Sequence, residues 1–176
     1  MTTHFFRITG AKNSGKTTLI VKLTEELIGR GYRVGTMKHS SHDHEFDRSG
    51  SDSHHHSVAG SSATIILSPN KLVCHTKRPP SEELFAIIRQ AYHDIDIVLC
   101  EGFARFPVAP QPTPMIECVA AGEDPLFTGD PDLVAVVADK TLPVDVPLFP
   151  HSATTELATW LEKTFHLAPD TNTGSP

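Results

Sequence analysis

The chain has 176 residues and a formal net charge of −6 at neutral pH. This length fits one compact domain that needs no disulfide or metal to fold, and the acidic balance argues against a nucleic-acid-binding protein, which would carry a basic stripe. The three cysteines (Cys74, Cys100 and Cys118) lack CxxC spacing. They indicate reduced, mostly buried thiols and a cytoplasmic location. We expect no signal peptide and no membrane span.

The first part of the chain predicts a strand, a glycine-rich turn, a helix and a second strand. Residues 3–9 (THFFRIT) form a short apolar run that ends at a glycine. Apolar residues then recur at helical spacing over about residues 15–30, and residues 32–39 predict the next strand. This order is that of a βαβ unit.

The middle of the chain predicts a long polar connection followed by a β-hairpin and a helix. Residues 40–62 are polar and rich in histidine, and so long a connection is typical of a functional or mobile segment. Residues 63–68 and 71–76 flank Pro69 and Asn70 as two short strands. Residues 81–93 predict a helix.

The last part of the chain predicts further strands and a closing helix. The apolar runs at 95–103 and 132–139 are typical of parallel strands covered on both faces. A Pro-rich loop over 106–114 leads to a strand at 115–120, for which an antiparallel extension is an alternative, and residues 153–165 predict an amphipathic helix. The order favours an α/β fold with a mainly parallel central sheet flanked by helices and a β-hairpin extension. We expect one domain over 1–168 and a disordered tail over 169–176.

The turn after the first strand matches the phosphate-binding pattern G-x-x-x-x-G-K-[ST] without a mismatch. Its fixed positions are Gly10, Gly15, Lys16 and Thr17, and it lies between a predicted strand and a predicted helix. Backbone N–H groups of such a loop converge on phosphate oxygens, the lysine reaches the β- and γ-phosphates, and the hydroxyl binds Mg²⁺. The predicted nucleotide-binding residues here are Gly10, Ala11, Lys12, Asn13, Ser14, Gly15, Lys16, Thr17 and Thr18.

A second element of a nucleotide site lies at the end of the apolar run DIVLCEG. Its terminal acid, Glu101, is predicted to hold Mg²⁺ together with Thr17, because an acid at the tip of a central strand beside a phosphate loop commonly serves the metal. Asp96 begins the same strand and is expected to be a solvated acid at the opposite edge of the sheet.

Acids and histidines crowd the segment after the second strand. Asp43 and Asp47 are both candidates for a further Mg²⁺ ligand, and the sequence does not choose between them. The histidines also suggest zinc or nickel binding, but their spacing matches no recognised zinc site and a solvated loop is the simpler interpretation. They are His39, His42, His44, His54, His55 and His56.

The residue that would read the nucleotide base is the least defined. The N-K-x-D motif is absent, because NKLV at 70–73 lacks the acid and falls in the predicted hairpin. Asp139, at the end of VAVVAD, is the best candidate for binding the amino group of the base. A structural role as a helix or turn cap is an equal alternative for this residue.

Several motifs together resemble one known family. Lys38-His39, Asp47-x-x-Gly50-x-Asp52-Ser53 and Glu101-Gly102-Phe103 follow the phosphate loop in order. With them, the chain up to about residue 165 resembles the family of molybdopterin-guanine dinucleotide biosynthesis protein B (MobB).

This resemblance implies a homodimeric, cytoplasmic GTP-binding adapter that uses Mg²⁺ and hydrolyses GTP slowly at most. The implied partners are the molybdenum cofactor guanylyltransferase, protein A of the same pathway, and the molybdopterin cofactor, with no nucleic acid and no membrane. The segment from Lys38 to Ser53 would line the pocket beside the phosphates, with Lys38 binding the nucleotide.

Two other functions remain open at this level. The histidines would suit a metallochaperone GTPase for metalloenzyme maturation, although the sequence has no cysteine-based metal site. A P-loop small-molecule kinase would need a basic lid, for which Lys77 and Arg78 are the only short candidates.

Overall fold

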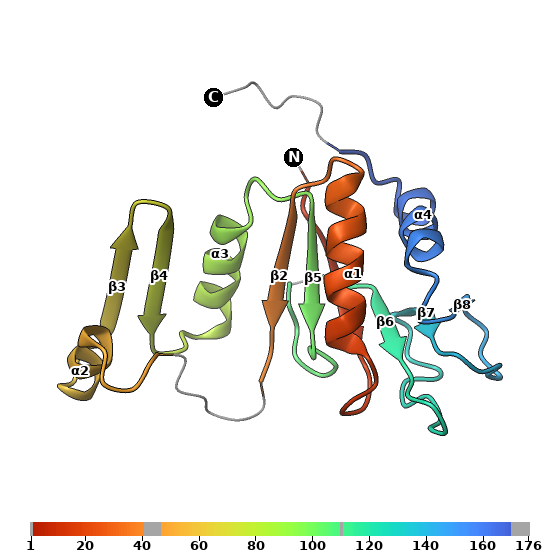
Figure 1. The fold of residues 1–176 in the computed structure, drawn as a ribbon, viewed down its shortest axis with the longest axis horizontal. Coiled ribbons are helices and arrows are strands. Elements are labelled where there is room, and N and C mark those ends of the chain that lie inside the picture. Colours follow the sequence, from red (N-terminus) through yellow and green to blue (C-terminus); the bar gives the residue numbers. More distant parts are fainter. Residues whose placement is uncertain (1, 41–46, 110, 170–176) are drawn as a thin grey trace. The chain divides into compact units, whose positions relative to one another are not determined.

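The computed structural model describes residues 2–40, 47–109 and 111–169. Figure 1 shows the order of its elements along the chain. The elements are β1 (His4–Thr9), α1 (Lys16–Gly29), β2 (Val34–Lys38), α2 (Asp52–Val58), β3 (Ala63–Ser68), β4 (Lys71–Thr76), α3 (Ser81–Ala91), β5 (Ile97–Glu101), β6 (Met115–Cys118), β7 (Leu133–Val137), β8 (Leu148–Phe149) and α4 (Thr154–Phe165).

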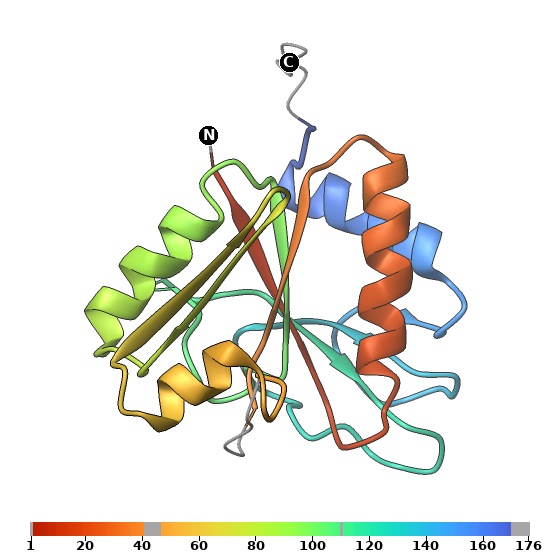
Figure 2. The same ribbon diagram turned by 60° about the vertical axis from the view of Figure 1, so that its left-hand side comes forward.

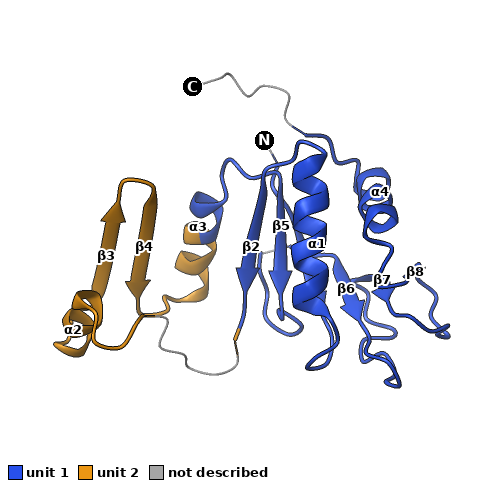
Figure 3. Cartoon of the chain, viewed as in Figure 1, with its two compact units in different colours: residues 1–39, 88–176 blue, residues 40–87 orange. Residues whose placement is uncertain are grey.

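The chain divides into two compact units (Figure 3). The single domain over residues 1–168 and the tail over 169–176 stay predictions. Residues 1–39 and 88–176 form the first, here called the core unit, and residues 40–87 form the second, here called the insert unit. The insert unit holds α2 and the antiparallel hairpin β3–β4. The hairpin is where the sequence predicts it.

The core unit is built on a six-stranded sheet with the order β2-β5-β1-β6-β7-β8. Every pairing in it is parallel, which confirms the predicted α/β class. The antiparallel alternative for residues 115–120 is wrong. Strand β6 pairs in parallel with β1 on one side and β7 on the other, because residues 102–114 carry the chain back to the opposite end of the sheet before β6 begins.

Both faces of this sheet are buried, which explains the continuous apolar runs in its strands. Phe6 and Ile8 of β1 face the helices α1 and α4 and pack in one cluster with Leu23 and Leu161. On β5, Val98 belongs to a second cluster on the other face. Figure 2 shows the strands crossing at an angle, which is the normal twist of a parallel sheet.

A buried arginine fixes the segment that precedes β6. The Arg7 guanidinium pairs with the Asp132 carboxylate at 2.6 Å and donates hydrogen bonds to the carbonyls of Thr113 and Phe103 at 3.0 and 3.3 Å. A buried charge is tolerated when an opposite charge and hydrogen-bond acceptors surround it. Arg7 therefore holds Phe103, which precedes the Pro-rich segment, and Thr113, near its end, against the sheet.

A short helix lies inside the segment that the sequence treats as a polar connection. The Ser51 hydroxyl accepts a hydrogen bond from the backbone N–H of His54 at 3.2 Å and so caps α2. No side chain of α2 is buried. The helix therefore carries no apolar stripe, which is the signal that sequence reasoning needs to find one.

The burial of the titratable groups differs in one respect from the prediction. Cys100 and Cys118 are buried and Cys74 is exposed; burial raises the pKa of each buried thiol to about 12, so both stay protonated. The prediction of a solvated Asp96 is wrong, because its carboxylate is buried against Arg33.

Over the described residues, no helix is long and apolar enough to cross a bilayer.

Asp96 stabilises the fold through a charge that depends on pH. It accepts hydrogen bonds from the Arg33 backbone N–H and guanidinium, both at 2.8 Å, and these bonds hold its pKa below the usual value. Asp96→Asn is expected to lower the free energy of unfolding by about 1–3 kcal/mol near neutral pH. Because the folded-state pKa is depressed, the stabilisation is complete above about pH 4 and fades as the pH falls further.

Urea denaturation at several pH values tests this prediction. Asp94→Asn is the matched control, since the Asp94 side chain is 68% exposed and should change the free energy of unfolding by less than about 0.5 kcal/mol. Equal effects of the two substitutions at neutral pH would contradict the role given to Asp96.

Candidate functional site

The phosphate loop connects β1 to α1 at the carboxyl edge of the sheet. Gly15 occupies the N-cap position of α1 with φ of 87°, a left-handed conformation that suits glycine. The first turn of α1 contains no acidic side chain. Its unpaired N–H groups and the positive end of the helix therefore face the loop and favour an anion there.

The start of the loop is packed tightly against a neighbouring strand. Gly10 has φ of 130°, and a Cβ at this position would lie 2.1 Å from the Cys118 carbonyl oxygen at the end of β6. No side chain fits in that space. The sequence motif requires glycine here for its backbone conformation, and the structure adds a steric requirement.

The side chain of Lys16 curls back over the loop. Its ammonium donates hydrogen bonds to the carbonyls of Ala11 at 2.5 Å and Gly10 at 3.2 Å, and it lies 3.5 Å from the Ser14 hydroxyl. A positive charge thus stands over the same backbone that a phosphate would approach, as the motif predicts.

The predicted metal ligands Thr17 and Glu101 are in contact. The Thr17 hydroxyl lies 3.1 Å from each carboxylate oxygen of Glu101, and the Lys38 ammonium lies 3.0 Å from one of them. The Glu101 side chain is 14% exposed. A hydroxyl and a carboxylate at one point are the oxygen donors that Mg²⁺ uses next to nucleotide phosphates, so these residues fit the ion.

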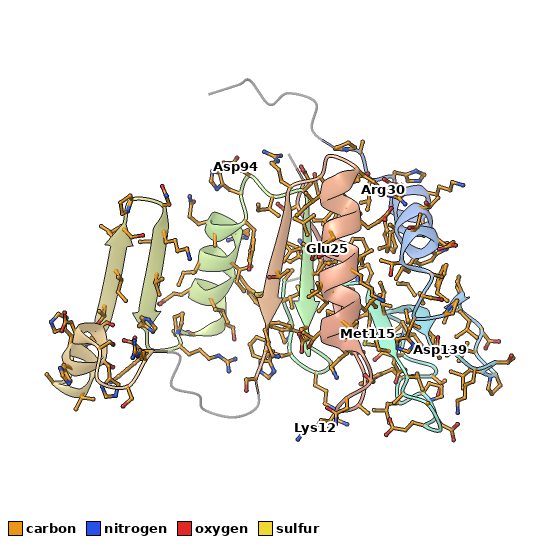
Figure 4. All side chains as sticks on the ribbon, in the orientation of Figure 1. Lys12, Glu25, Arg30, Asp94, Met115 and Asp139 are labelled. Carbon is orange, nitrogen blue, oxygen red and sulfur yellow. The ribbon has the colours of Figure 1, made fainter. Side chains whose placement is uncertain are left out.

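These side chains line one pocket of about 490 Å³ in the core unit. Its volume is in the usual range for small-molecule sites. Figure 4 shows Lys12 extending outward from the loop below α1. The lining residues are Lys12, Asn13, Ser14, Gly15, Lys16, Thr17, Thr18, Lys38 and Glu101.

Asp139 is absent from this lining and contacts His151 instead. One Asp139 oxygen accepts from the His151 backbone N–H at 2.9 Å, and the other lies 3.4 Å from the ring Nδ1. The ring Nε2 of His151 donates to the Ser14 carbonyl at 3.1 Å. Asp139 therefore caps a turn, as the alternative interpretation had it. Its second oxygen is 3.4 Å from a ring that touches the phosphate loop, and its role toward a base stays a prediction.

Sequence reasoning missed two residues that shape this edge. His151 is one of them, because it lies 137 positions from Ser14 and belongs to no motif. Glu117 is the other: its fully buried carboxylate accepts hydrogen bonds from the backbone N–H groups of Leu126 and Phe127 at 2.6 and 3.1 Å. An acid within the apolar run MIEC was the available signal, because a buried carboxylate needs donors. Glu117 anchors the loop that follows β6.

Of the two candidate aspartates of the insert unit, the structure describes only Asp47. Asp43 lies outside the described residues. Hydrogen bonds from Ser53, Ser51 and the Arg48 backbone hold the pKa of Asp47 below its usual value. Asp47 thus organises the turn before α2, and its role as a metal ligand stays a prediction.

The histidine cluster is only partly visible. His54, His55 and His56 lie on α2, while His42 and His44 fall outside the described residues. In the part of the chain that the structure describes, no group of three or more His, Cys, Asp or Glu side chains is arranged to hold a metal. His39 stacks on Phe106 with ring centroids 5.2 Å apart.

Comparison with known proteins identifies relatives over most of the chain. The family profile described as molybdopterin guanine dinucleotide synthesis protein B (MobB) matches residues 5–139. The molybdopterin-guanine dinucleotide biosynthesis adapter protein of Haemophilus influenzae is 33% identical over 160 residues, covering 90% of this chain and 88% of that protein. The adapter protein of Escherichia coli is 35% identical over 139 residues, covering 77% and 78%.

Solved structures agree with this assignment. A crystal structure of molybdopterin-guanine biosynthesis protein B superposes with a TM-score of 0.63 at 25% identity, covering 92% of this chain and 99% of the other. The Bacillus subtilis MobB structure gives 0.68 at 21% identity, with coverage of 95% and 99%, and supports the fold alone.

The contact between Thr17 and Glu101 predicts a metal-dependent site. Thr17→Val keeps the shape of the side chain and removes the hydroxyl, so the gain in nucleotide affinity on adding Mg²⁺ should fall by about tenfold or more. Titration of a fluorescent nucleotide in Mg²⁺ and in EDTA measures this gain.

Thr24→Val is the control within the same helix. Thr24 lies outside the pocket lining, and its buried hydroxyl has no hydrogen-bond partner, so this substitution should leave the effect of Mg²⁺ unchanged. A Thr17→Val protein that responds to Mg²⁺ like the wild type would rule out Thr17 as a metal ligand.

Proposed function

Because this chain belongs to the MobB family, we propose that it is a cytoplasmic GTP-binding adapter of molybdenum cofactor biosynthesis. It binds Mg²⁺ and GTP at the phosphate loop and assists the assembly of molybdopterin guanine dinucleotide. The observation that carries the proposal is the convergence of Lys16, Thr17 and Glu101 on one pocket at the carboxyl edge of a parallel sheet.

The charges around the pocket support a phosphate ligand. Lys12, Lys16 and Lys38 line it together with a single acid, Glu101, although the whole chain has a net charge of −6. Three cations around one concave site concentrate positive potential there. The acid serves the metal, which neutralises charge on the β- and γ-phosphates.

Recognition of guanine is proposed for the neighbouring turn. Asp139 and His151 follow the adjacent strands β7 and β8; His151 contacts the Ser14 carbonyl of the loop, and Asp139 contacts His151. The Asp139 side chain is 68% exposed, so one of its oxygens remains accessible to the amino group of a base.

We propose slow GTP hydrolysis at most. The sequence offers no convincing arginine finger and no glutamine placed to orient water, groups that accelerate hydrolysis by about 10³ to 10⁵. Such a protein retains its nucleotide, which suits an adapter for the guanylyltransferase of the same pathway, protein A, together with the molybdopterin cofactor.

We propose a homodimer, with the β3–β4 hairpin as its interface. Leu67 and Leu72 are paired on one face and are 78% and 67% exposed, while Ile66 and Val73 are paired on the other face and are 37% and 41% exposed. A two-stranded sheet is marginally stable alone, and apolar side chains on both faces need cover. A second copy of the chain supplies the same apolar surface.

The first test is a binding titration with GTP and ATP. GTP is expected to bind at least about tenfold more tightly than ATP, and Lys16→Ala should weaken GTP binding by at least about 100-fold because Lys16 contacts two phosphates. Lys22→Ala, on the same helix and outside the pocket lining, should have little effect. Equal affinity for GTP and ATP would count against the adapter function. If Lys16→Ala left GTP binding unchanged, the phosphate loop would not be the nucleotide site.

The second test concerns the dimer. Leu67→Asp should shift the protein to a monomer at micromolar concentration in size-exclusion chromatography with light scattering, because the charge would be buried at the interface. Leu126→Asp is the matched control, a leucine of similar exposure (63%) outside the hairpin. If both variants remain dimers, the interface lies elsewhere.

A further inference from the structure

Lys38 is placed beside the predicted metal ligand by the register of the sheet. It is the last residue of β2 and pairs directly with Glu101, the last residue of β5. The Lys38 ammonium lies 3.0 Å from a Glu101 oxygen, and its side chain is 66% exposed. Lys38 thus combines a fixed backbone with a long, solvated side chain that is able to move.

The ion pair of Lys38 competes with metal binding at the same carboxylate. Glu101 already accepts the Thr17 hydroxyl, and its side chain is largely buried. A divalent cation and an ammonium group repel each other at contact distance. When Mg²⁺ occupies the oxygens of Thr17 and Glu101, the Lys38 ammonium must give up this position.

The anion that a displaced Lys38 would meet in this pocket is the terminal phosphate of a bound nucleotide, because Lys38 lines the same pocket as the phosphate loop. Lys16 and the N–H groups of the loop would hold the β-phosphate, and Thr17 and Glu101 would hold the Mg²⁺ that neutralises charge on the phosphates. Glu101 and Lys38 lie on β5 and β2, on the side of β1 away from β6. An ammonium group released from Glu101 on this side of the pocket would therefore lie within reach of the terminal phosphate.

We propose that Lys38 is a metal-dependent γ-phosphate sensor, which pairs with Glu101 until Mg²⁺ binds and then contacts the γ-phosphate. This inference rests on the proposed function, since it requires Mg²⁺ and GTP in the pocket. It gives the adapter a way to distinguish GTP from GDP that works only when the metal is present.

The alternative role for Lys38 is a nonspecific electrostatic one, in which its charge neutralises Glu101 and attracts any phosphate group. The two roles differ in their dependence on the ligand. A general charge affects GTP and GDP alike, with or without Mg²⁺, whereas a γ-phosphate contact affects GTP alone and needs the metal.

The test measures the dissociation constants of GTP and GDP for Lys38→Met in Mg²⁺ and in EDTA. In Mg²⁺ the variant should lose about 10- to 100-fold in GTP affinity, the usual effect of removing a charge-assisted hydrogen bond, and less than about 3-fold in GDP affinity. In EDTA both nucleotides should change by the same factor. Lys38→Arg keeps the charge and should retain a preference for GTP in Mg²⁺.

Lys12→Met is the matched control, because Lys12 lines the same pocket on the phosphate loop and, within the described part of the chain, forms no ion pair with Glu101. It should change GTP and GDP affinity by one common factor. Thermal unfolding of each variant verifies the fold.

Equal weakening of GTP and GDP by Lys38→Met in Mg²⁺, or no weakening at all, would overturn the sensor role and leave the proposed function intact. A wild-type protein that binds neither nucleotide would overturn both.

Discussion

The candidate site depends on the close approach of the phosphate loop to strand β6. Gly10 leaves β1 with φ of 130° and passes so near the Cys118 carbonyl that a side chain at this position would overlap it. This contact joins the ends of two neighbouring strands and sets the path by which the chain enters α1. The positions of Lys16 and Thr17 follow from it, because both begin the helix.

The second constraint on the site is electrostatic. Among the residues that the structure describes, Glu101 is the only acid that lines the pocket with its three lysines, and it is largely buried. A buried carboxylate needs partners, and here it has a hydroxyl from Thr17 and an ammonium from Lys38. These two partners would respond to a metal ion in opposite ways, because the Thr17 hydroxyl would bind the ion together with Glu101 and the Lys38 ammonium would be repelled by it. A site built in this way can couple metal binding to the phosphate that it holds.

The sequence predicts the parts of this arrangement that are local. Residues 10–18 form a contiguous motif, and Glu101 ends a continuous apolar strand, so the loop, the acid and the parallel sheet are all found before the structure is known. Contacts between distant residues are not predictable in this way. His151 reaches Ser14 across 137 positions, and Asp96 is buried by a partner 63 positions away that no pattern connects to it.

We infer that this chain holds a nucleotide rather than consuming it. Single-turnover hydrolysis of GTP in Mg²⁺, with protein in excess and no partner present, tests this claim most directly. We expect hydrolysis on the order of 10⁻⁴ to 10⁻³ per second, as in nucleotide sites without an activating arginine. Hydrolysis at about 1 per second or faster would contradict it and would make the site a catalytic one.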